Sequence, residues 1–297
     1  MTTTPGPADR LVVLGAGVMG TGISALALGH GVSVALIDTD PEQLVRAEQG
    51  IAEQLRLAEL MGRLPAGAGA TGPGTPSTGT LSTGGGLEPV DGATAVIEAV
   101  TEDAGLKAAL LAEVSGRVRP GTLLVSNTSS IPVDELADSV ARPADLLGTH
   151  FMNPPSLIRT VEVVRGARTG DAAMVTVQAL LAALGRTPVV VRDSPGFVTS
   201  RVLHPMINTA ARVVQDGTAS VEAVDALMQG CLGHPTGPLR TADLIGIDNL
   251  VDSLWVLHER TGDESCRPCD LLLSKVRAGA LGRKSGAGFY TYQEDNR

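Results

Sequence analysis

A glycine-rich turn near the N-terminus constrains the fold of this chain more than any other feature. The apolar run 11–14 is typical of a buried strand, the sequence GAGVMG follows at 15–20, and the next residues have the apolar spacing of a helix. In a GxGxxG turn between a strand and a helix, free N–H groups at the helix start face the phosphates of a dinucleotide. The residues expected to bind that dinucleotide are Gly15, Gly17, Val18, Met19 and Gly20.

The end of the second apolar run indicates which dinucleotide binds. This run covers 32–37 and ends at Asp38, where a carboxylate can accept hydrogen bonds from the hydroxyls of an adenosine ribose. The residues that follow, Thr39, Asp40 and Pro41, are not basic, so nothing there would receive a 2′-phosphate. We therefore predict NAD rather than NADP as the cofactor, with Asp38 and Thr39 at its ribose.

The remaining apolar runs predict the rest of the fold. They lie at 95–97, 122–125, 146–151, 161–164 and 189–191, and helical patterns separate most of them. This alternation is typical of an α/β domain with helices on both faces of a parallel sheet. We therefore expect a Rossmann-type, doubly wound parallel sheet in an NAD-binding domain at 1–193. After the sequence DSPG at 193–196 only helical periodicities follow, which predicts an all-helical domain at 194–297.

Length and composition agree with two globular domains and exclude several classes of protein. A chain of 297 residues fits two domains of about 150 residues each. The net charge of −9 would repel a phosphate backbone, and six aromatic residues offer few rings to stack on bases, so nucleic acid is not an expected partner. No apolar stretch of about 18 residues or more is present, so no membrane span is expected either.

The cysteines and the N-terminus predict a cytoplasmic protein without a metal. No export signal is evident, and three cysteines, an odd number, suggest reduced thiols. Cys266 and Cys269 form a CxxC pair, but a structural zinc site normally has four ligands and no second pair exists. We expect two reduced thiols in a surface loop.

The segment 66–86 interrupts the pattern of strands and helices. Of its 21 residues 8 are glycine and none is charged. Such a composition buries too little apolar surface to offset the entropy of ordering, which predicts a mobile surface loop. A lid over a binding cleft is the functional alternative.

One histidine lies where an open α/β sheet binds its ligands. His150 ends the run 146–149, and ligands bind at the carboxyl ends of such strands. Glu162 lies on the next extended run, where its carboxylate could accept a hydrogen bond from one imidazole nitrogen and leave the other to take a proton. The four histidines expected to be structural are His30, His204, His234 and His258.

With these motifs in order, the chain resembles the L-3-hydroxyacyl-CoA dehydrogenases, which include bacterial 3-hydroxybutyryl-CoA dehydrogenase. The resemblance covers nearly the whole chain. Its motifs are GAGVMG at 15, VIEAVTED around Glu98 and Glu102, SNTSS at 126–130, THFMNPP around His150, TVEVV at Glu162, DSPGFVTSR from 193, GHPTGPLRTADLIGID at 233–248 and LGRKSGAGFYTY from 281.

The resemblance implies an activity and a role for individual residues. The reaction would be NAD-dependent interconversion of a 3-hydroxyacyl-CoA and its 3-oxo form, with His150 as general base oriented by Glu162. Ser129 would contact the reacting oxygen of the substrate. The resemblance also implies a homodimer formed through the C-terminal helical domain. The residues that it places around the nicotinamide and its ribose are Glu102, Lys107, Asn127 and Asn153.

Two departures from the family leave the substrate open. Ser200 stands where the family usually has an asparagine, so water or a differently placed substrate should fill the space beside it. No Lys or Arg occurs from Leu64 to Leu106, which offers little charge to the phosphates of CoA. An alternative is therefore a thioester on an acyl carrier protein, as in relatives that oxidise glyceryl or hydroxymalonyl carrier-protein thioesters for polyketide extender units.

An alternative of another class is a non-catalytic NAD-binding sensor or scaffold. A fold kept only for binding has no physical need for an aligned base and carboxylate. The joint presence of four residues therefore favours an enzyme, and these are Ser129, His150, Asn153 and Glu162.

Overall fold

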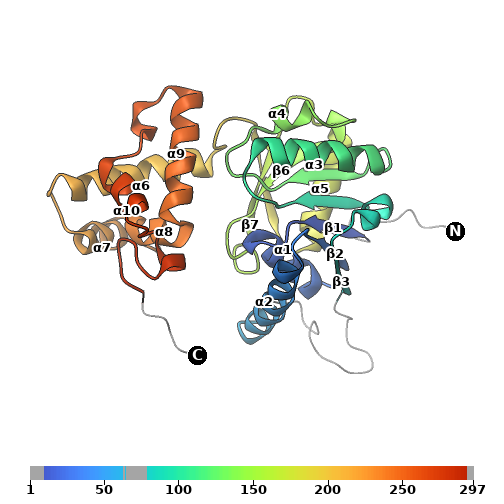
Figure 1. Cartoon of the computed structure of the whole chain (residues 1–297), viewed down its shortest axis with the longest axis horizontal. Coiled ribbons are helices and arrows are strands. Elements are labelled where there is room, and N and C mark those ends of the chain that lie inside the picture. The colour runs from blue at the N-terminus through green and yellow to red at the C-terminus, as the bar shows by residue number, and fades with distance from the viewer. Residues whose placement is uncertain (1–9, 63, 65–78, 293–297) are drawn as a thin grey trace. The chain divides into compact units, whose positions relative to one another are not determined.

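The protein consists of two compact units, Met1–Asp193 and Ser194–Arg297. The computed structural model describes residues 10–62, 64 and 79–292 (Figure 1).

The first unit is built on one eight-stranded sheet. Its strand order is β3-β2-β1-β4-β5-β6-β7-β8, and the first six positions have the order of a dinucleotide-binding α/β fold. The strands are β1 (Leu11–Leu14), β2 (Val34–Ile37), β3 (Leu81–Gly84), β4 (Ala95–Glu98), β5 (Leu123–Ser126), β6 (Leu146–His150), β7 (Thr160–Arg165) and β8 (Thr187–Arg192).

Helices cover both faces of this sheet at its centre, which is why strands such as β1 and β5 are fully buried and rich in apolar residues. All four residues of β1 are buried, but only Leu11 and Val13 belong to the core that α1, α2 and α5 share. Val12 and Leu14 therefore point to the opposite face, because successive side chains of a strand alternate. The helices of this unit are α1 (Val18–Gly29), α2 (Pro41–Leu60), α3 (Ala104–Arg117), α4 (Val133–Ala137) and α5 (Asp171–Ala183), with the short η1 (Glu88–Gly92) and η2 (Pro143–Asp145).

The predicted fold class is confirmed, with one departure in strand direction. The first six strands in sheet order are parallel to their neighbours, but β7 is antiparallel to β6, and β8 is parallel to β7. A short connection at 151–159 makes this reversal, because it is too short for the crossover helix that a parallel pair needs. The reversal places residues from the two sides of the connection opposite each other.

The prediction of a loop over the whole of 66–86 is wrong at its C-terminal end. Leu81–Gly84 forms β3, a parallel edge strand in register with Val34–Ile37 of β2. Its backbone hydrogen-bonds to β2, which stabilises a sequence that has little apolar surface of its own. Residues 66–78, and with them the lid alternative, lie outside the described residues.

The second unit is helical, as predicted. One core joins its helices, centred on buried side chains such as Ile207, Leu239 and Leu254. No described helix of the chain is both long and apolar enough to span a membrane. The helices are α6 (Thr199–Gln215), α7 (Val221–Leu232), α8 (Pro238–Ile245), α9 (Ile247–Thr261), η3 (Glu264–Cys266), α10 (Asp270–Arg277) and η4 (Arg283–Ser285).

The predicted surface position of the CxxC pair is wrong. Cys266 and Cys269 are 2% and 5% exposed and belong to the core of the helical unit. Burial raises the pKa of both thiols, which keeps them protonated and unreactive. Among the described residues, no three His, Cys, Asp or Glu side chains are grouped as metal ligands would be.

Candidate active site

Each of the three glycines of the first turn is needed for a structural reason. Gly15 has φ of +97°, and a β-carbon there would lie 2.7 Å from the carbonyl oxygen of Ala99. A β-carbon on Gly20 would overlap the carbonyl oxygen of Gly15, so these two glycines allow α1 to approach the strands. Gly17 differs, because nothing lies within 4 Å of a β-carbon built on it. Its open side is where a ligand can approach the backbone.

The start of α1 has the chemistry of a phosphate site. Thr21 N is the first N–H of this turn that donates to a helical acceptor, the carbonyl oxygen of Gly17. The N–H groups of Gly17, Val18, Met19 and Gly20 donate to no acceptor within the described ranges. Together with the positive end of the helix dipole, these donors suit a pyrophosphate.

Asp38 lies beside this turn at the end of β2. Its Oδ2 accepts a hydrogen bond from Ala16 N at 2.7 Å and its Oδ1 accepts one from Asp40 N at 2.9 Å. Each carboxylate oxygen has a second lone pair, so the hydroxyls of a ribose can still bind. Thr39 is exposed directly after it. The turn and this carboxylate together fit NAD.

His150 and Glu162 form a buried cross-strand pair. His150 is the last residue of β6, and the antiparallel register places it opposite Glu162 of β7. Its Nδ1 lies 3.0 Å from Oε2 of Glu162, and the two side chains are 8% and 6% exposed. Because the carboxylate can only accept, Nδ1 carries the proton in the neutral ring and Nε2 bears the lone pair.

Glu102 holds the turn that carries Ser129. Its Oε1 accepts hydrogen bonds from Ser129 N at 2.8 Å, from Ser130 N at 3.0 Å and from the hydroxyl of Thr128. Burial acts to raise the pKa of Glu102, but the charge of Lys107 and these hydrogen bonds outweigh it and lower the pKa. Glu102 is therefore ionised, and it fixes the backbone beneath the Ser129 hydroxyl.

Lys107 is buried, and its contact with the cofactor stays a prediction. Its side chain is 1% exposed, and its Nζ lies 2.6 Å from Oε1 of Glu98, 3.2 Å from Val100 O and 3.3 Å from Oε2 of Glu102. Ser126 also donates to Glu98, at 2.6 Å. These contacts use the ammonium group inside the protein. We therefore interpret Lys107 as a residue that positions Glu102 beside the cofactor site.

The remaining predicted site residues lie in two different units. Asn127 follows β5, is 8% exposed, and its Oδ1 accepts a hydrogen bond from Phe151 N at 3.1 Å, next to His150. Asn153 is exposed on the connection after β6. Ser200 lies in the first turn of α6, in the helical unit, and its contact with substrate stays a prediction.

Comparison with known proteins decides the family. Residues 10–194 match the family described as "3-hydroxyacyl-CoA dehydrogenase, NAD binding domain", and residues 196–292 match "3-hydroxyacyl-CoA dehydrogenase, C-terminal domain". The chain belongs to the 3-hydroxyacyl-CoA dehydrogenase family. It is thus an enzyme that uses NAD, which agrees with the cofactor predicted from Asp38.

Relatives match this dehydrogenase over nearly its full length. A probable 3-hydroxybutyryl-CoA dehydrogenase of Bacillus subtilis is 41% identical over 96% of this chain and 98% of its own. A protein with the same description from Deinococcus radiodurans is 40% identical over 94% and 99%. The crystal structure of (S)-3-hydroxybutyryl-CoA dehydrogenase PaaH1 from Ralstonia eutropha superposes with a TM-score of 0.86, at 35% identity, over 96% of this chain and 100% of that one.

The sequence did not predict the buried polar cluster that supports this dehydrogenase site. The cluster of Glu98, Lys107 and Ser126 joins a strand end, a helix and the next strand end. One signal was present, because Glu98 ends the apolar run of β4 with a charge, and a charge at a fully buried strand position needs a partner. Which residue supplies that partner depended on the packing of α3 against the sheet.

Proposed function

We propose that this enzyme oxidises the 3-hydroxyl of a 3-hydroxyacyl thioester to a 3-oxo group, with NAD⁺ as the oxidant and His150 as general base. The observation that carries the proposal is the buried hydrogen bond of His150 to Glu162 at the carboxyl end of β6. Ligands of such sheets bind at that end, where the chain also places Asn127 and the Ser129 turn.

We assign the following roles to the residues of this site. The 3-hydroxyl transfers its proton to Nε2 of His150 while the C3–H bond breaks, and the C3–O bond becomes a carbonyl. The resulting imidazolium is stabilised by the carboxylate of Glu162 and keeps its orientation through Nδ1. By resemblance to the family, the Ser129 hydroxyl donates to the reacting oxygen, and Asn153 lies beside the nicotinamide. When bound, NAD⁺ supplies the acceptor for the hydride that leaves C3.

A panel of thioesters tests the proposal. We expect NADH to form from 3-hydroxyacyl thioesters, and none from matched acyl thioesters that lack the 3-hydroxyl. The reaction is followed by nicotinamide absorbance with purified protein. Absence of NADH from every 3-hydroxyacyl thioester on either carrier, with folded protein that binds NAD, would refute the assignment.

The carrier of the acyl group has two candidates, and we favour CoA. The names of the relatives speak for CoA, whereas the lack of Lys and Arg from Leu64 to Leu106 speaks for an acyl carrier protein. Comparing kcat/KM for the same acyl group on CoA and on a carrier protein decides between them. Equal or better use of the CoA thioester removes the carrier-protein candidate. The reaction on either carrier is assigned to the cytoplasm.

Asp38 should determine the choice of dinucleotide. We expect Asp38→Asn to weaken NADH binding by about 10- to 100-fold, because a hydrogen bond to a charged acceptor contributes about 1.5–3 kcal/mol. The affinity for NADPH should fall less, since the variant removes the charge that repels a 2′-phosphate. Fluorescence titration with both nucleotides measures this, and Asp40→Asn, which alters a neighbouring exposed carboxylate at the start of α2, is the control. Equal affinity of the natural protein for NADH and NADPH would contradict the role of Asp38.

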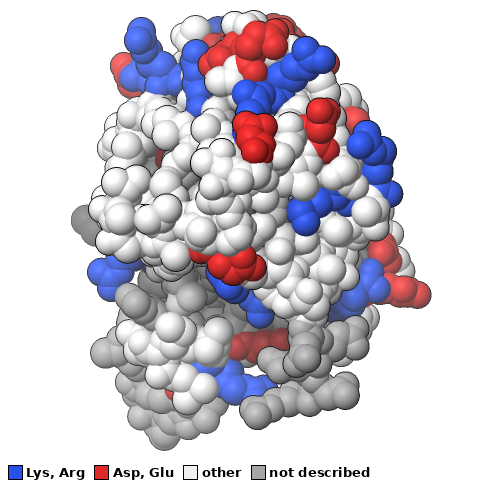
Figure 2. All heavy atoms as spheres, turned by 90° about the vertical axis from the view of Figure 1, so that its left-hand side faces the viewer, with Lys and Arg blue, Asp and Glu red and all other residues white. Residues whose placement is uncertain are grey.

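The helical unit exposes large apolar side chains that a homodimer could bury. Figure 2 shows a broad area without Lys, Arg, Asp or Glu on the side where α6 and α7 lie in Figure 1. Helices α6, α7 and α8 pack against one another, and five large apolar side chains at their surfaces are about half exposed or more. These side chains are Val198, Val202, Leu227, Leu232 and Leu244.

A substitution on this surface tests the dimer. We expect the protein to be a dimer by light scattering at micromolar concentration, and Val202→Glu to shift it toward monomer by at least about tenfold in dissociation constant, since a buried unpaired charge is costly. Val175→Glu is the matched control, because Val175 is as exposed, at 67%, but lies on α5 of the other unit. A monomer in the unsubstituted protein would contradict the proposal.

A further inference from the structure

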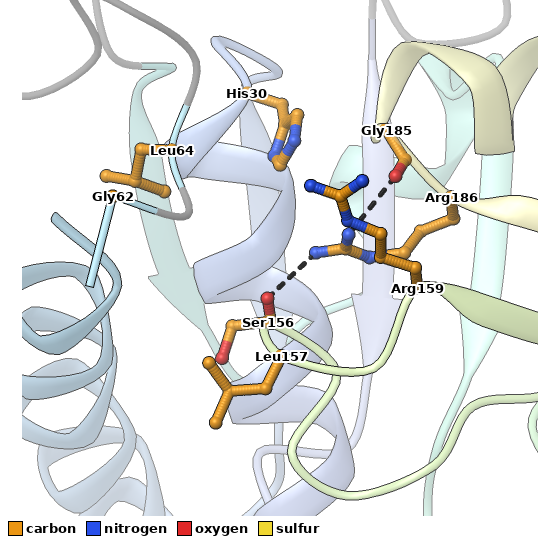
Figure 3. A pocket seen from close by; sticks show the side chains of 8 residues that line it. All are labelled: His30, Gly62, Leu64, Ser156, Leu157, Arg159, Gly185 and Arg186. Atoms are coloured by element: carbon orange, nitrogen blue, oxygen red, sulfur yellow. Dashed lines mark hydrogen bonds between the residues drawn. The ribbon is translucent and has the colours of Figure 1, made fainter.

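A basic pocket of about 310 Å³ lies in the first unit, apart from the residues assigned above (Figure 3). It is enclosed by the C-terminal end of α1, the residues after α2, the segment 156–159 before β7, and the turn between α5 and β8. Its polar side chains are His30, Ser156, Arg159 and Arg186, and glycine and leucine form the rest of its wall. None of the described residues that line it is acidic, although the chain as a whole carries a charge of −9.

Arg186 is a buried cation with an unused donor. The residue is 7% exposed. Its Nη1 donates to Gly185 O and its Nη2 to Ser156 O, both at 3.1 Å, as the dashed lines in Figure 3 mark. Its Nε is buried and has no acceptor among the residues that the structure describes. An unsatisfied donor on a buried charge is costly, and an anion in the pocket would remove that cost.

Arg159 adds positive charge and further donors to the same space, and His30 adds an imidazole. Arg159 is exposed, and within the described ranges neither arginine forms an ion pair. Figure 3 shows the two guanidinium groups side by side, with the ring of His30 directed toward them. Nδ1 of His30 donates to Leu26 O at 2.9 Å, so Nε2 is the nitrogen that remains for a ligand. A β-carbon on Gly185 would lie 2.8 Å from this Nε2, so the glycine keeps the ring accessible.

The charges in the pocket are poorly compensated without a ligand. Burial lowers the pKa of Arg186, and the charge of Arg159 lowers it further. Burial also lowers the pKa of His30, its hydrogen bond to Leu26 opposes this shift, and the charge of Arg186 adds to it. A bound anion reverses the repulsion that acts on all three groups.

We propose that this pocket binds a phosphate group of a phosphorylated small molecule, held by Arg159, Arg186 and His30. A carboxylate can be satisfied by the planar fork of one arginine. Two guanidinium groups offer donors from several directions, which suits a tetrahedral group with three terminal oxygens and close to two charges. The imidazole can accept a hydrogen bond from a protonated phosphate oxygen, or donate one once a bound anion favours its protonated form. Nε of Arg186 is one donor that such a group would satisfy.

Two sources can supply this phosphate. One is the nucleotide end of a CoA thioester, and this source rests on the proposed function. The segment 156–159 that lines the pocket lies between His150 and Glu162 in the chain, so one molecule could reach from the site to the pocket. The other source is a free phosphorylated metabolite that binds independently of the substrate.

Calorimetry on the NAD-saturated enzyme tests the pocket itself. Saturation with NAD occupies the phosphate site at α1, so the probes, adenosine 3′,5′-bisphosphate and inorganic phosphate, report only on other sites. We expect the bisphosphate to bind, and Arg159→Gln and Arg186→Gln each to weaken it by about tenfold or more, because each removes a charged hydrogen bond. Arg159→Lys should restore part of the loss. Arg119→Gln, which removes an exposed arginine outside the pocket, should change nothing.

The proposal is overturned if each probe binds the natural protein and Arg159→Gln with the same affinity. It is also overturned if neither probe binds the natural protein. Arg159 is exposed, so its substitution decides the matter even where Arg186→Gln fails to fold. This binding arm does not depend on turnover and therefore fails or succeeds separately from the proposed function.

Kinetics distinguish the two sources. If CoA supplies the phosphate, Arg159→Gln raises KM for a 3-hydroxyacyl-CoA by about tenfold, leaves kcat unchanged, and has no effect on the same acyl group carried by pantetheine. If KM for the CoA thioester is unchanged while phosphate binding is weakened, the pocket binds a free phosphorylated metabolite.

Discussion

Replacing His150 with glutamine should lower kcat by about 10²- to 10⁴-fold, the range that a positioned general base contributes. Glutamine keeps a hydrogen-bonding group of similar size opposite Glu162 but cannot accept a proton at neutral pH. KM for the thioester and affinity for NADH should change little, because the cofactor turn and Asp38 lie on other strands. Steady-state turnover with a 3-hydroxyacyl thioester and a separate NADH titration measure the two effects.

A control separates loss of the base from loss of the fold. His204 is 7% exposed, as is His150, but it lies in the helical unit. Its Nδ1 lies 2.7 Å from the hydroxyl of Ser253. His204→Gln should retain far more activity than His150→Gln. A His150→Gln enzyme with the parent rate would contradict the mechanism, because another group would then have to accept the proton.

The second large effect is on stability. We expect Lys107→Met to lower the free energy of unfolding by about 3–5 kcal/mol, the usual result of leaving one partner of a buried ion pair without the other. The side chains of Lys107 and Glu98 are 1% and 0% exposed, so water cannot replace the lost partner. Glu102 would also lose its contact with the ammonium group, and the Ser129 turn would lose part of its support. Urea unfolding followed by circular dichroism measures the change.

Two further variants test whether the buried charge is the cause. The double variant Glu98→Gln/Lys107→Met removes both charges and keeps an acceptor for Ser126, so it should be more stable than Lys107→Met alone. Arg117→Met breaks an exposed ion pair with Asp91 and should change stability little. A Lys107→Met protein as stable as its parent would show that the ion pair does not stabilise the fold.

Most of the first unit was predictable because the central strands of its sheet are buried on both faces. Runs such as Leu11–Leu14 and Leu123–Ser126 are continuous and apolar, and they can be recognised without knowledge of their neighbours. The edge strand Leu81–Gly84 has the sequence LSTG, which has no such signature. Its conformation comes from pairing with β2, so its sequence alone does not predict it.

The candidate site was predictable where its residues are close in sequence or belong to a motif. His150 and Glu162 are separated by one short connection, and their pairing follows once β7 reverses direction. The basic pocket was not predicted, because Arg159, Arg186 and His30 come from separate elements and only the packing of α1 against the connection before β7 brings them together. His30 was expected to be structural, and nothing in its local sequence indicated a ligand.

The geometry of the reacting groups is the most direct test of the account. A crystal structure of the enzyme with NADH and a 3-oxoacyl thioester measures the distance from Nε2 of His150 to the 3-oxo oxygen. We predict about 2.6–3.2 Å, the reach needed for proton transfer, with C3 of the thioester facing the nicotinamide. A 3-oxo oxygen bound beyond the reach of His150, with another side chain in its place, would contradict the mechanism.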